Sequence, residues 1–84
     1  MSNIDYSKLR SLTAKELIRA LLKDGFYLER SSGAHYQFYH PDSRRVTVSY
    51  HRTGETFKLR TLKSMIEIQA QWTDEDLIRL NILK

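Results

Sequence analysis

The feature that most constrains the fold of this 84-residue chain is a set of three strand patterns flanked by helix patterns. Apolar and polar residues alternate in the segments 26–30, 34–40 and 45–50, as expected of an antiparallel sheet with one face in solvent. The segment 41–44 has the composition of a turn. Side chains alternate between the two faces of a strand, so one set must point inward. The residues expected on the inner face are Phe26, Leu28, Tyr36, Phe38, Val46, Val48 and Tyr50.

A helix is predicted to precede the strands, and it begins at a capping box. Thr13 and Glu16 have the spacing at which a hydroxyl and a carboxylate close the first helical turn reciprocally. Gly25 is placed to end this helix in the left-handed conformation. The apolar stripe predicted for the helix consists of Leu17, Ile18, Leu21 and Leu22.

Two more helices are predicted after the strands. A polar loop at 51–56 leads into a helix that begins near Lys58 and ends before Trp72. Its apolar stripe is predicted to consist of Leu59, Leu62, Met65 and Ile66. Thr73 is a second N-cap, and the acidic residues after it favour the positive end of a helix dipole. A short third helix is therefore expected, with Leu77, Ile78 and Leu80 as its apolar residues.

This order of elements predicts an α+β fold. Both main helices need the apolar face of the sheet, so we expect a two-layer sandwich. The order α-β-β-β-α with a short C-terminal helical extension is the topology of the double-stranded-RNA-binding domain, although a fold alone does not define a function. The length is that of a single domain. We expect a lead-in with weak periodicity over residues 1–12 and one domain over residues 13–84.

The composition favours an anionic partner and argues against several classes of protein. The net charge of +4 makes nucleic acid the first candidate and an acidic protein the second. The chain contains no cysteine, which excludes disulfides and thiolate metal sites. Residues 1–5 are polar, unlike a secretion signal, and no stretch has the apolar length of a membrane span. We therefore expect a cytoplasmic protein that does not bind membranes.

His35 is the candidate for chemistry. It follows the small-residue turn 31–34, and the alternation places it on the outer face of the predicted sheet. RNA cleavage needs a proton removed from the 2′-hydroxyl and a proton given to the leaving 5′-oxygen, and imidazole can do either near neutral pH. Gly33 permits a phosphate backbone to approach closely. The pattern by itself slightly favours a surface histidine without a role.

The other two histidines differ in their expected positions. His40 has inward parity beside Pro41, so we expect it to cap the turn or to pack at the core edge. His51 shares outward parity with His35 and is an open candidate for a second proton-transfer group. Their spacing does not match a helical metal motif, and His35 and His40 point to opposite faces, so no metal site is expected.

A basic cluster is predicted at the start of the second main helix, where free N–H groups also favour an anion. It consists of Lys58, Arg60 and Lys63, which fit a phosphate site and a solvated helix face about equally well; the net charge favours phosphate. The arginines that could extend this footprint are Arg30, Arg44, Arg45 and Arg52. Among the aromatic residues, only the outward Tyr27 and Tyr39 could stack on bases.

Several short motifs, taken in order, resemble the HicA (YcfA-like) toxin family. The motifs are KELIR and KDGF within 15–26, SGAHY at 32–36, YHP at 39–41 and LRTLKSMI at 59–66. Each is short, but their order and spacing together are fairly specific, and the resemblance covers roughly residues 13–80. Members of this family are small bacterial mRNA interferases with a fold like that of the double-stranded-RNA-binding domain.

The resemblance implies a catalytic residue and a protein partner. The catalytic histidine of the family lies in a Gly-Ser-His segment, and the corresponding residue of this chain is His35. The family usually has serine where this chain has Ala34, and often a second histidine where this chain has Tyr36. The resemblance also implies a HicB-type antitoxin that binds the toxin and blocks its active site.

The function expected from these observations is that of a toxin acting as a metal-independent endoribonuclease on mRNA, without a small-molecule cofactor. His35 would be the general acid or base, and the residues that bind the RNA would be Gly33, Lys58, Arg60 and Lys63. One alternative is a non-catalytic RNA-binding module of the same fold. This alternative is suggested by Ala34 and Tyr36, which differ from the residues that the family usually or often has at these positions. Another alternative, motivated by charge alone, is a domain that binds an acidic protein.

Overall fold

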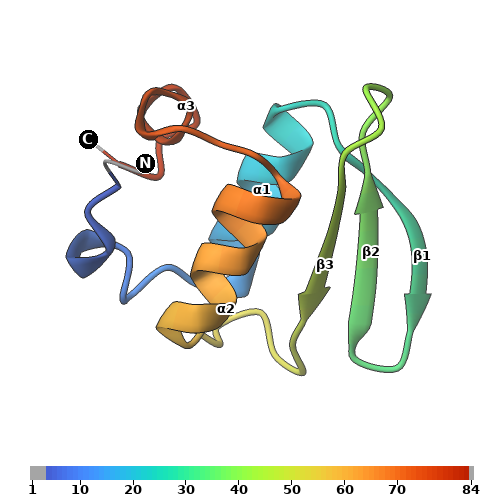
Figure 1. Ribbon diagram of the computed structural model, residues 1–84. Coiled ribbons are helices and arrows are strands. Elements are labelled where there is room, and N and C mark those ends of the chain that lie inside the picture. Colours follow the sequence, from blue (N-terminus) through green and yellow to red (C-terminus); the bar gives the residue numbers. More distant parts are fainter. Residues whose placement is uncertain (1–3, 84) are drawn as a thin grey trace.

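The computed structural model describes residues 4–83 and has two layers, with the helices on one side of a three-stranded sheet (Figure 1). This arrangement confirms the predicted α+β order of a helix, three antiparallel strands and further helices. In chain order the elements are η1 (Tyr6–Lys8), α1 (Ala14–Lys23), β1 (Tyr27–Ser32), β2 (His35–Tyr39), β3 (Arg45–Ser49), α2 (Leu59–Lys63), η2 (Ser64–Gln69) and α3 (Asp74–Arg79).

The sheet has the order β1-β2-β3, and both neighbouring pairs are antiparallel. As predicted, Phe38, Val46 and Val48 point into the core, while the residues between them face solvent. Leu28 was expected inward but is 49% exposed. The reason is that β1 lies at the far edge of the sheet, where all six of its residues are exposed and the helical layer does not cover them (Figure 1).

Helix α1 begins at the predicted capping box. The Glu16 backbone N–H donates to the Thr13 hydroxyl at 3.2 Å, and the Thr13 N–H donates to the Glu16 carboxylate at 2.9 Å. Gly25 has a φ of +100°, the positive value predicted for the residue after the helix. Leu17 and Leu21 are buried, but Leu22 is exposed, because it lies beyond the part of the helix surface that meets the core.

Helix α2 continues directly into the π-helical turn η2, and together they end before Trp72 as predicted. Leu62, Met65 and Ile66 are buried, whereas Leu59, in the first turn, is exposed. The side chain of Gln69 accepts the backbone N–H of Thr47 at 2.8 Å. This contact occupies a donor on the outer edge of β3, so the helical layer partly closes that edge of the sheet.

The lead-in contributes to the core, which its weak periodicity did not predict. Leu9 and Leu12 are both buried in the same cluster as the helices and the sheet. Asp5 caps the short helix η1 by accepting the N–H of Ser7 at 3.1 Å. Residues 1–3 of the predicted lead-in lie outside the described part of the chain. In the predicted third helix, α3, Leu77 and Leu80 are buried, while Ile78 is exposed.

A nearly buried carboxylate, that of Asp24, joins four segments of the chain. It accepts the Trp72 indole N–H at 2.8 Å and a guanidinium N–H of Arg79 at 2.9 Å. It also pairs with Arg44 at 3.2 Å. These contacts connect the end of α1 to the β2–β3 turn, to the segment after η2 and to α3. Arg44, which was a candidate for the RNA footprint, therefore pairs with Asp24 in this cluster.

The Asp24 cluster also sets the titration of its carboxyl group. Burial acts to raise the pKa of Asp24, but the hydrogen bonds from Trp72 and Arg79 and the charges of Arg44 and Arg79 outweigh it, so the pKa lies below its ordinary value of 3.8. A depressed carboxyl pKa contributes stability that is complete above the ordinary value and is lost as the pH falls below it.

We expect Asp24→Asn to lower the free energy of unfolding by roughly 2 kcal/mol, because it removes the charge that pairs with Arg79 and with the half-buried Arg44, which keeps only Asp42 as an ionised partner. Arg79→Ala, which removes the exposed member of the cluster, should cost no more than about 1 kcal/mol. Urea unfolding at pH 7 and at pH 3 measures both effects. The wild type should lose more stability between these pH values than Asp24→Asn does, and equal losses would contradict the assignment.

Candidate active site

His35 is presented by a tight turn between β1 and β2. Ser32 pairs with His35 across the hairpin, which leaves only Gly33 and Ala34 as loop residues. Gly33 has a φ of +59°, whereas Ala34 does not have a positive φ, a combination that matches a type II′ turn. A residue with a Cβ is strained in that conformation, which explains the glycine. The turn leaves open space around Gly33, since a Cβ placed there would meet nothing within 4 Å.

The imidazole of His35 lies on the solvent-exposed face of the sheet and is held by one neighbour. Its Nδ1 lies 2.8 Å from the hydroxyl oxygen of Ser49, the residue that pairs with His35 on β3. A hydroxyl can donate to this nitrogen or accept from it, so the contact suits either tautomer. Within residues 4–83, no hydrogen bond engages Nε2, which remains available to a substrate.

The two outward histidines line the same pocket. This open pocket of about 440 Å³ is lined by Ser32, Gly33, Ala34, His35, Ser49, Tyr50, His51 and Glu55. His51 enters it from the loop that follows β3. The structure therefore brings His35 and His51 together, as their shared parity allowed.

The loop that carries His51 is fixed from two directions. The Glu55 carboxylate accepts the backbone N–H of His51 at 3.3 Å and that of Arg52 at 3.1 Å. The backbone carbonyl of Glu55 accepts the first free N–H of α1, that of Ala14, at 2.8 Å. One wall of the pocket is thus anchored to the N-terminus of a core helix.

His40 has the structural role predicted for it. Its Nδ1 accepts the backbone N–H of Asp42 at 3.1 Å, which caps the turn, and its Nε2 donates to the carbonyl of Asp24 at 2.9 Å. The ring packs edge-on against Phe26 at a centroid distance of 5.0 Å.

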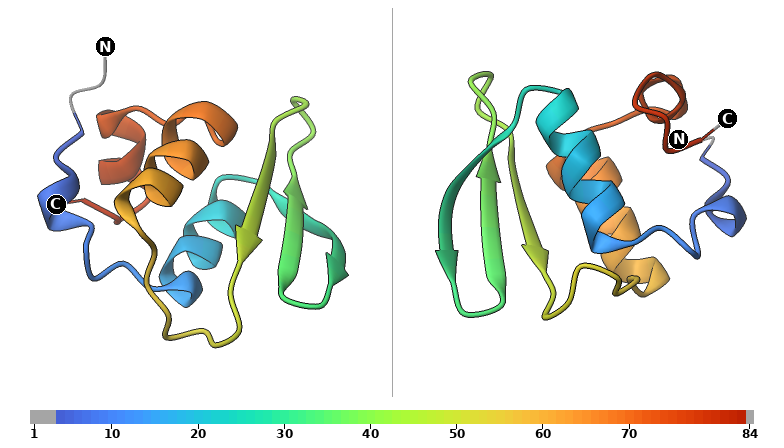
Figure 2. Two further views of the ribbon diagram at one scale, coloured as in Figure 1. Left: turned by 60° about the horizontal axis from the view of Figure 1, so that its bottom comes forward. Right: turned by 180° about the vertical axis from the view of Figure 1, so that it is seen from behind.

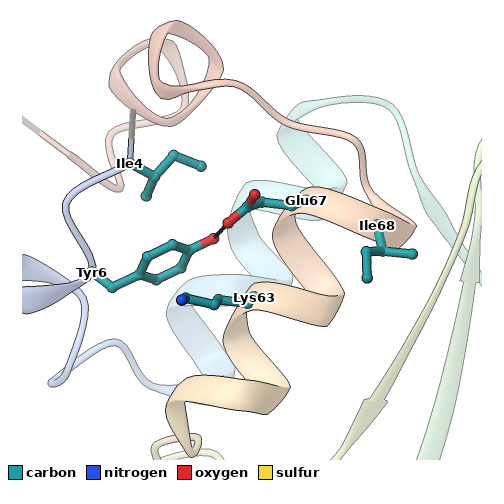
Figure 3. Close-up of a pocket in the computed structure, with 5 residues that line it drawn as sticks. All are labelled: Ile4, Tyr6, Lys63, Glu67 and Ile68. Atoms are coloured by element: carbon teal, nitrogen blue, oxygen red, sulfur yellow. Dashed lines mark hydrogen bonds between the residues drawn. The ribbon is translucent and has the colours of Figure 1, made fainter. Parts of the chain in front are cut away.

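One member of the predicted basic cluster, Lys63, contacts the N-terminal segment. Lys58 occupies the N-cap position of α2 without a capping hydrogen bond from its side chain, and both Lys58 and Arg60 are exposed. The start of α2 lies at the same end of the molecule as the His35 turn (Figure 2). Lys63 instead extends away from the sheet toward the N-terminal segment, with its ammonium 5.6 Å from the centre of the Tyr6 ring (Figure 3). The structure does not bring Lys63 together with His35.

The pocket around Lys63 joins the N-terminal segment to the helical layer. The Tyr6 hydroxyl donates to the Glu67 carboxylate, and Ile4 and Ile68 complete the lining (Figure 3). Burial, followed by the hydrogen bond and the charge of Glu67, raises the pKa of Tyr6. The neutral Tyr6 hydroxyl donates a hydrogen bond to the Glu67 carboxylate, and this contact joins η1 to η2.

Two further properties of residues 4–83 bear on the kind of protein this is. No three or more His, Asp or Glu side chains in this range gather where they could hold a metal ion. None of the helices in the same range has both the length and the apolar character that a membrane crossing requires.

The fold and the pocket define a small α+β domain, like the double-stranded-RNA-binding domain, that exposes a histidine on the bare face of its sheet. Residues 14–72 match the family described as the HicA toxin of bacterial toxin-antitoxin systems. The match covers more than half of the chain, so the chain belongs to the HicA toxin family. Membership makes it the toxin of a toxin–antitoxin system, with an antitoxin as its partner. No curated protein matches the chain.

Ser49 and Glu55 are pocket residues that the sequence did not single out. Ser49 had the same outward parity as His35, but parity does not tell which residues of neighbouring strands face each other. The register decides that Ser49 stands opposite His35. Glu55 lies in a polar loop, where no periodicity exists to place it.

We expect Ser49→Ala to free the imidazole of His35 without unfolding the protein, because the hydroxyl is exposed and its hydrogen bond contributes about 1 kcal/mol or less. Nitrogen-15 NMR of the imidazole should show altered Nδ1 and Nε2 chemical shifts for His35 in Ser49→Ala. Ser49→Thr, which keeps the hydroxyl, should retain the wild-type shifts. Identical spectra for Ser49→Ala and the wild type would show that the hydroxyl does not hold the ring.

Proposed function

We propose that this toxin is an endoribonuclease that cleaves mRNA without a metal ion, with His35 as a general acid or base. The single observation that carries this proposal is the open pocket that His35 and His51 line together. One imidazole of this pocket is oriented through Nδ1 by Ser49 and offers Nε2 to a substrate. Family membership supports the role as a toxin, and the two histidines of the pocket support acid/base catalysis of RNA cleavage.

The reaction needs only groups that the RNA and the pocket contain. The 2′-oxygen attacks the adjacent phosphorus while its proton passes to a general base, and the bond from phosphorus to the 5′-oxygen breaks while an acid protonates that oxygen. The products are a 2′,3′-cyclic phosphate and a free 5′-hydroxyl. Each of the two proton transfers can be performed by an imidazole. We therefore assign one transfer to His35 and the other to His51.

Binding of the RNA backbone is assigned to the end of the molecule that carries the His35 turn. The bare surface of Gly33 lets a phosphate approach the turn closely. Lys58 and Arg60 are exposed near the start of α2, and we propose that they contact flanking phosphates. Lys63 is left out of this surface, since it lies over Tyr6 (Figure 3).

We further propose that the antitoxin is of the HicB type and that it covers the pocket. This follows from the family, in which the antitoxin blocks the active site. The pocket is open and lies between the β1–β2 turn and the loop after β3, so such a partner can reach it without rearrangement of the core.

The deciding experiment measures cleavage of a labelled mRNA by the purified toxin in EDTA. We expect cleavage by the wild type and a rate about 10²–10⁴-fold lower for His35→Ala, because a positioned acid or base contributes a factor of this size. Products with 2′,3′-cyclic phosphate ends would support the transphosphorylation route. RNA binding without cleavage by the wild type would instead support a non-catalytic RNA-binding module, and equal rates for both proteins would remove His35 from the mechanism.

The same assay tests the role assigned to His51. We expect His51→Ala to lower the cleavage rate about 10²–10⁴-fold, because one of the two proton transfers loses its positioned imidazole. A wild-type rate in His51→Ala would assign the second proton transfer to another group.

We expect Lys58→Ala to weaken RNA binding and Lys63→Ala to leave it unchanged, although each variant removes one positive charge from an exposed lysine. A phosphate contact on single-stranded RNA contributes about 0.7 to the slope of log K against log salt concentration. Titrations of His35→Ala protein, which avoids cleavage, should show this loss of slope for Lys58→Ala only. Equal slopes for both lysine variants would place the RNA elsewhere.

A further inference from the structure

The solvent-exposed face of the sheet continues from the candidate active site to the opposite end of the strands. All helices lie on the other side of the sheet (Figure 1). The register arranges the outward residues in rows that run across the strands. The first row is Ser32, His35 and Ser49; the second is Arg30, Gln37 and Thr47; the third is Tyr27, Tyr39 and Arg45.

The third row is an aromatic platform with a cation beside it. The rings of Tyr27 and Tyr39 meet at a centroid distance of 5.8 Å and an angle of 75°. The guanidinium of Arg45 lies 5.1 Å from the centre of the Tyr39 ring. Arg45 covers Tyr39, so the open aromatic surface belongs to Tyr27, which is 46% exposed. Tyr39 packs against Tyr27 and fixes how that ring is presented.

The aromatic platform lies on the same strand and the same face as His35. Tyr39 lies four positions after His35 on β2, which corresponds to about 13 Å along the strand. The row between them carries Arg30, and the third row carries Arg45, so cations accompany the aromatic rings along this face. A chain of alternating phosphates and bases can therefore extend from the pocket along the sheet.

We propose that the Tyr27–Tyr39–Arg45 platform binds an unpaired base of the RNA substrate. The base stacks on the ring of Tyr27, and Arg45 pairs with an adjacent phosphate. This inference rests on the proposed function, since it assigns a second contact to the same substrate. Bases of a duplex are stacked on each other and cannot reach the platform, so the substrate bound here is single-stranded.

Stacking on a ring tolerates every base, because each base has a π face. The platform therefore selects for unpaired RNA of sufficient length and does not select for a particular base. Tyr27 should affect the affinity for substrate, whereas the proton transfers are performed by His35 and His51 in the pocket. A substrate too short to reach from the pocket to the third row gains nothing from the platform.

The test uses His35→Ala protein and a single-stranded RNA that carries 2-aminopurine, a base whose fluorescence falls when it stacks. We expect quenching on binding. A further Tyr27→Ala change should lower the affinity about five- to hundredfold and abolish the quenching, whereas Tyr27→Phe keeps both. The matched control is Leu28→Ala, which removes an equally exposed side chain from the opposite face of β1 and should change neither. A thermal melt of each variant confirms that the sheet is intact.

Each outcome separates this proposal from the nuclease assignment. Loss of quenching in Tyr27→Ala alone supports the platform even if the wild type cleaves no RNA. Equal affinity and quenching in Tyr27→Ala and Tyr27→Phe overturns the platform even if the wild type cleaves RNA. An annealed duplex whose binding depends on Tyr27, or a Tyr27→Ala defect in antitoxin binding with RNA binding intact, also overturns it.

Discussion

The structure depends on a sheet that is covered on only one of its faces. The helical layer buries apolar side chains against one face of β2 and β3, and in these two strands the inward residues alternate with residues that face solvent. The burial of Phe38 and Val48 therefore forces their neighbours outward. By the same alternation, His35, three residues before Phe38 on β2, also faces outward. A one-residue slip of β2 would bury the imidazole, so the apolar core determines where the candidate chemistry takes place.

Two polar anchors hold the ends of this sandwich in place. At one end, the Asp24 carboxylate joins α1 to Trp72 and to Arg44 in the β2–β3 turn. At the other end, the loop after β3 is fastened to the N-terminus of α1 by the carbonyl of Glu55. The second anchor fixes the wall that carries His51. The pocket thus has one wall on a tight hairpin and another on a loop fastened to the core, an arrangement that suits a site that must keep its geometry.

The local signals in the sequence were sufficient for the element order and for the parity of β2 and β3, whereas the β-bulge between Leu28 and Arg30 in β1 was not predicted. The capping box at Thr13, the N-cap at Thr73 and the positive φ of Gly25 depend on neighbours within a few residues, and all three occur as predicted. The apolar stripes were predicted too wide. Leu22, Leu28 and Leu59 fit a periodic pattern but lie where no second layer covers them. Periodicity tells which way a side chain points, but it does not tell how far the opposite layer extends.

The sequence by itself determined the fold class, the outward parity of His35, the family motifs and the glycine that the turn requires. These depend on backbone conformation and on alternation, which are local. The tertiary structure alone decided that Ser49 meets His35, that His51 enters the same pocket and that Lys63 turns away toward Tyr6. It also brought Leu9 and Leu12 into the core. Each of these depends on strand register or on helix packing, which join residues far apart in the chain through contacts that no local pattern encodes.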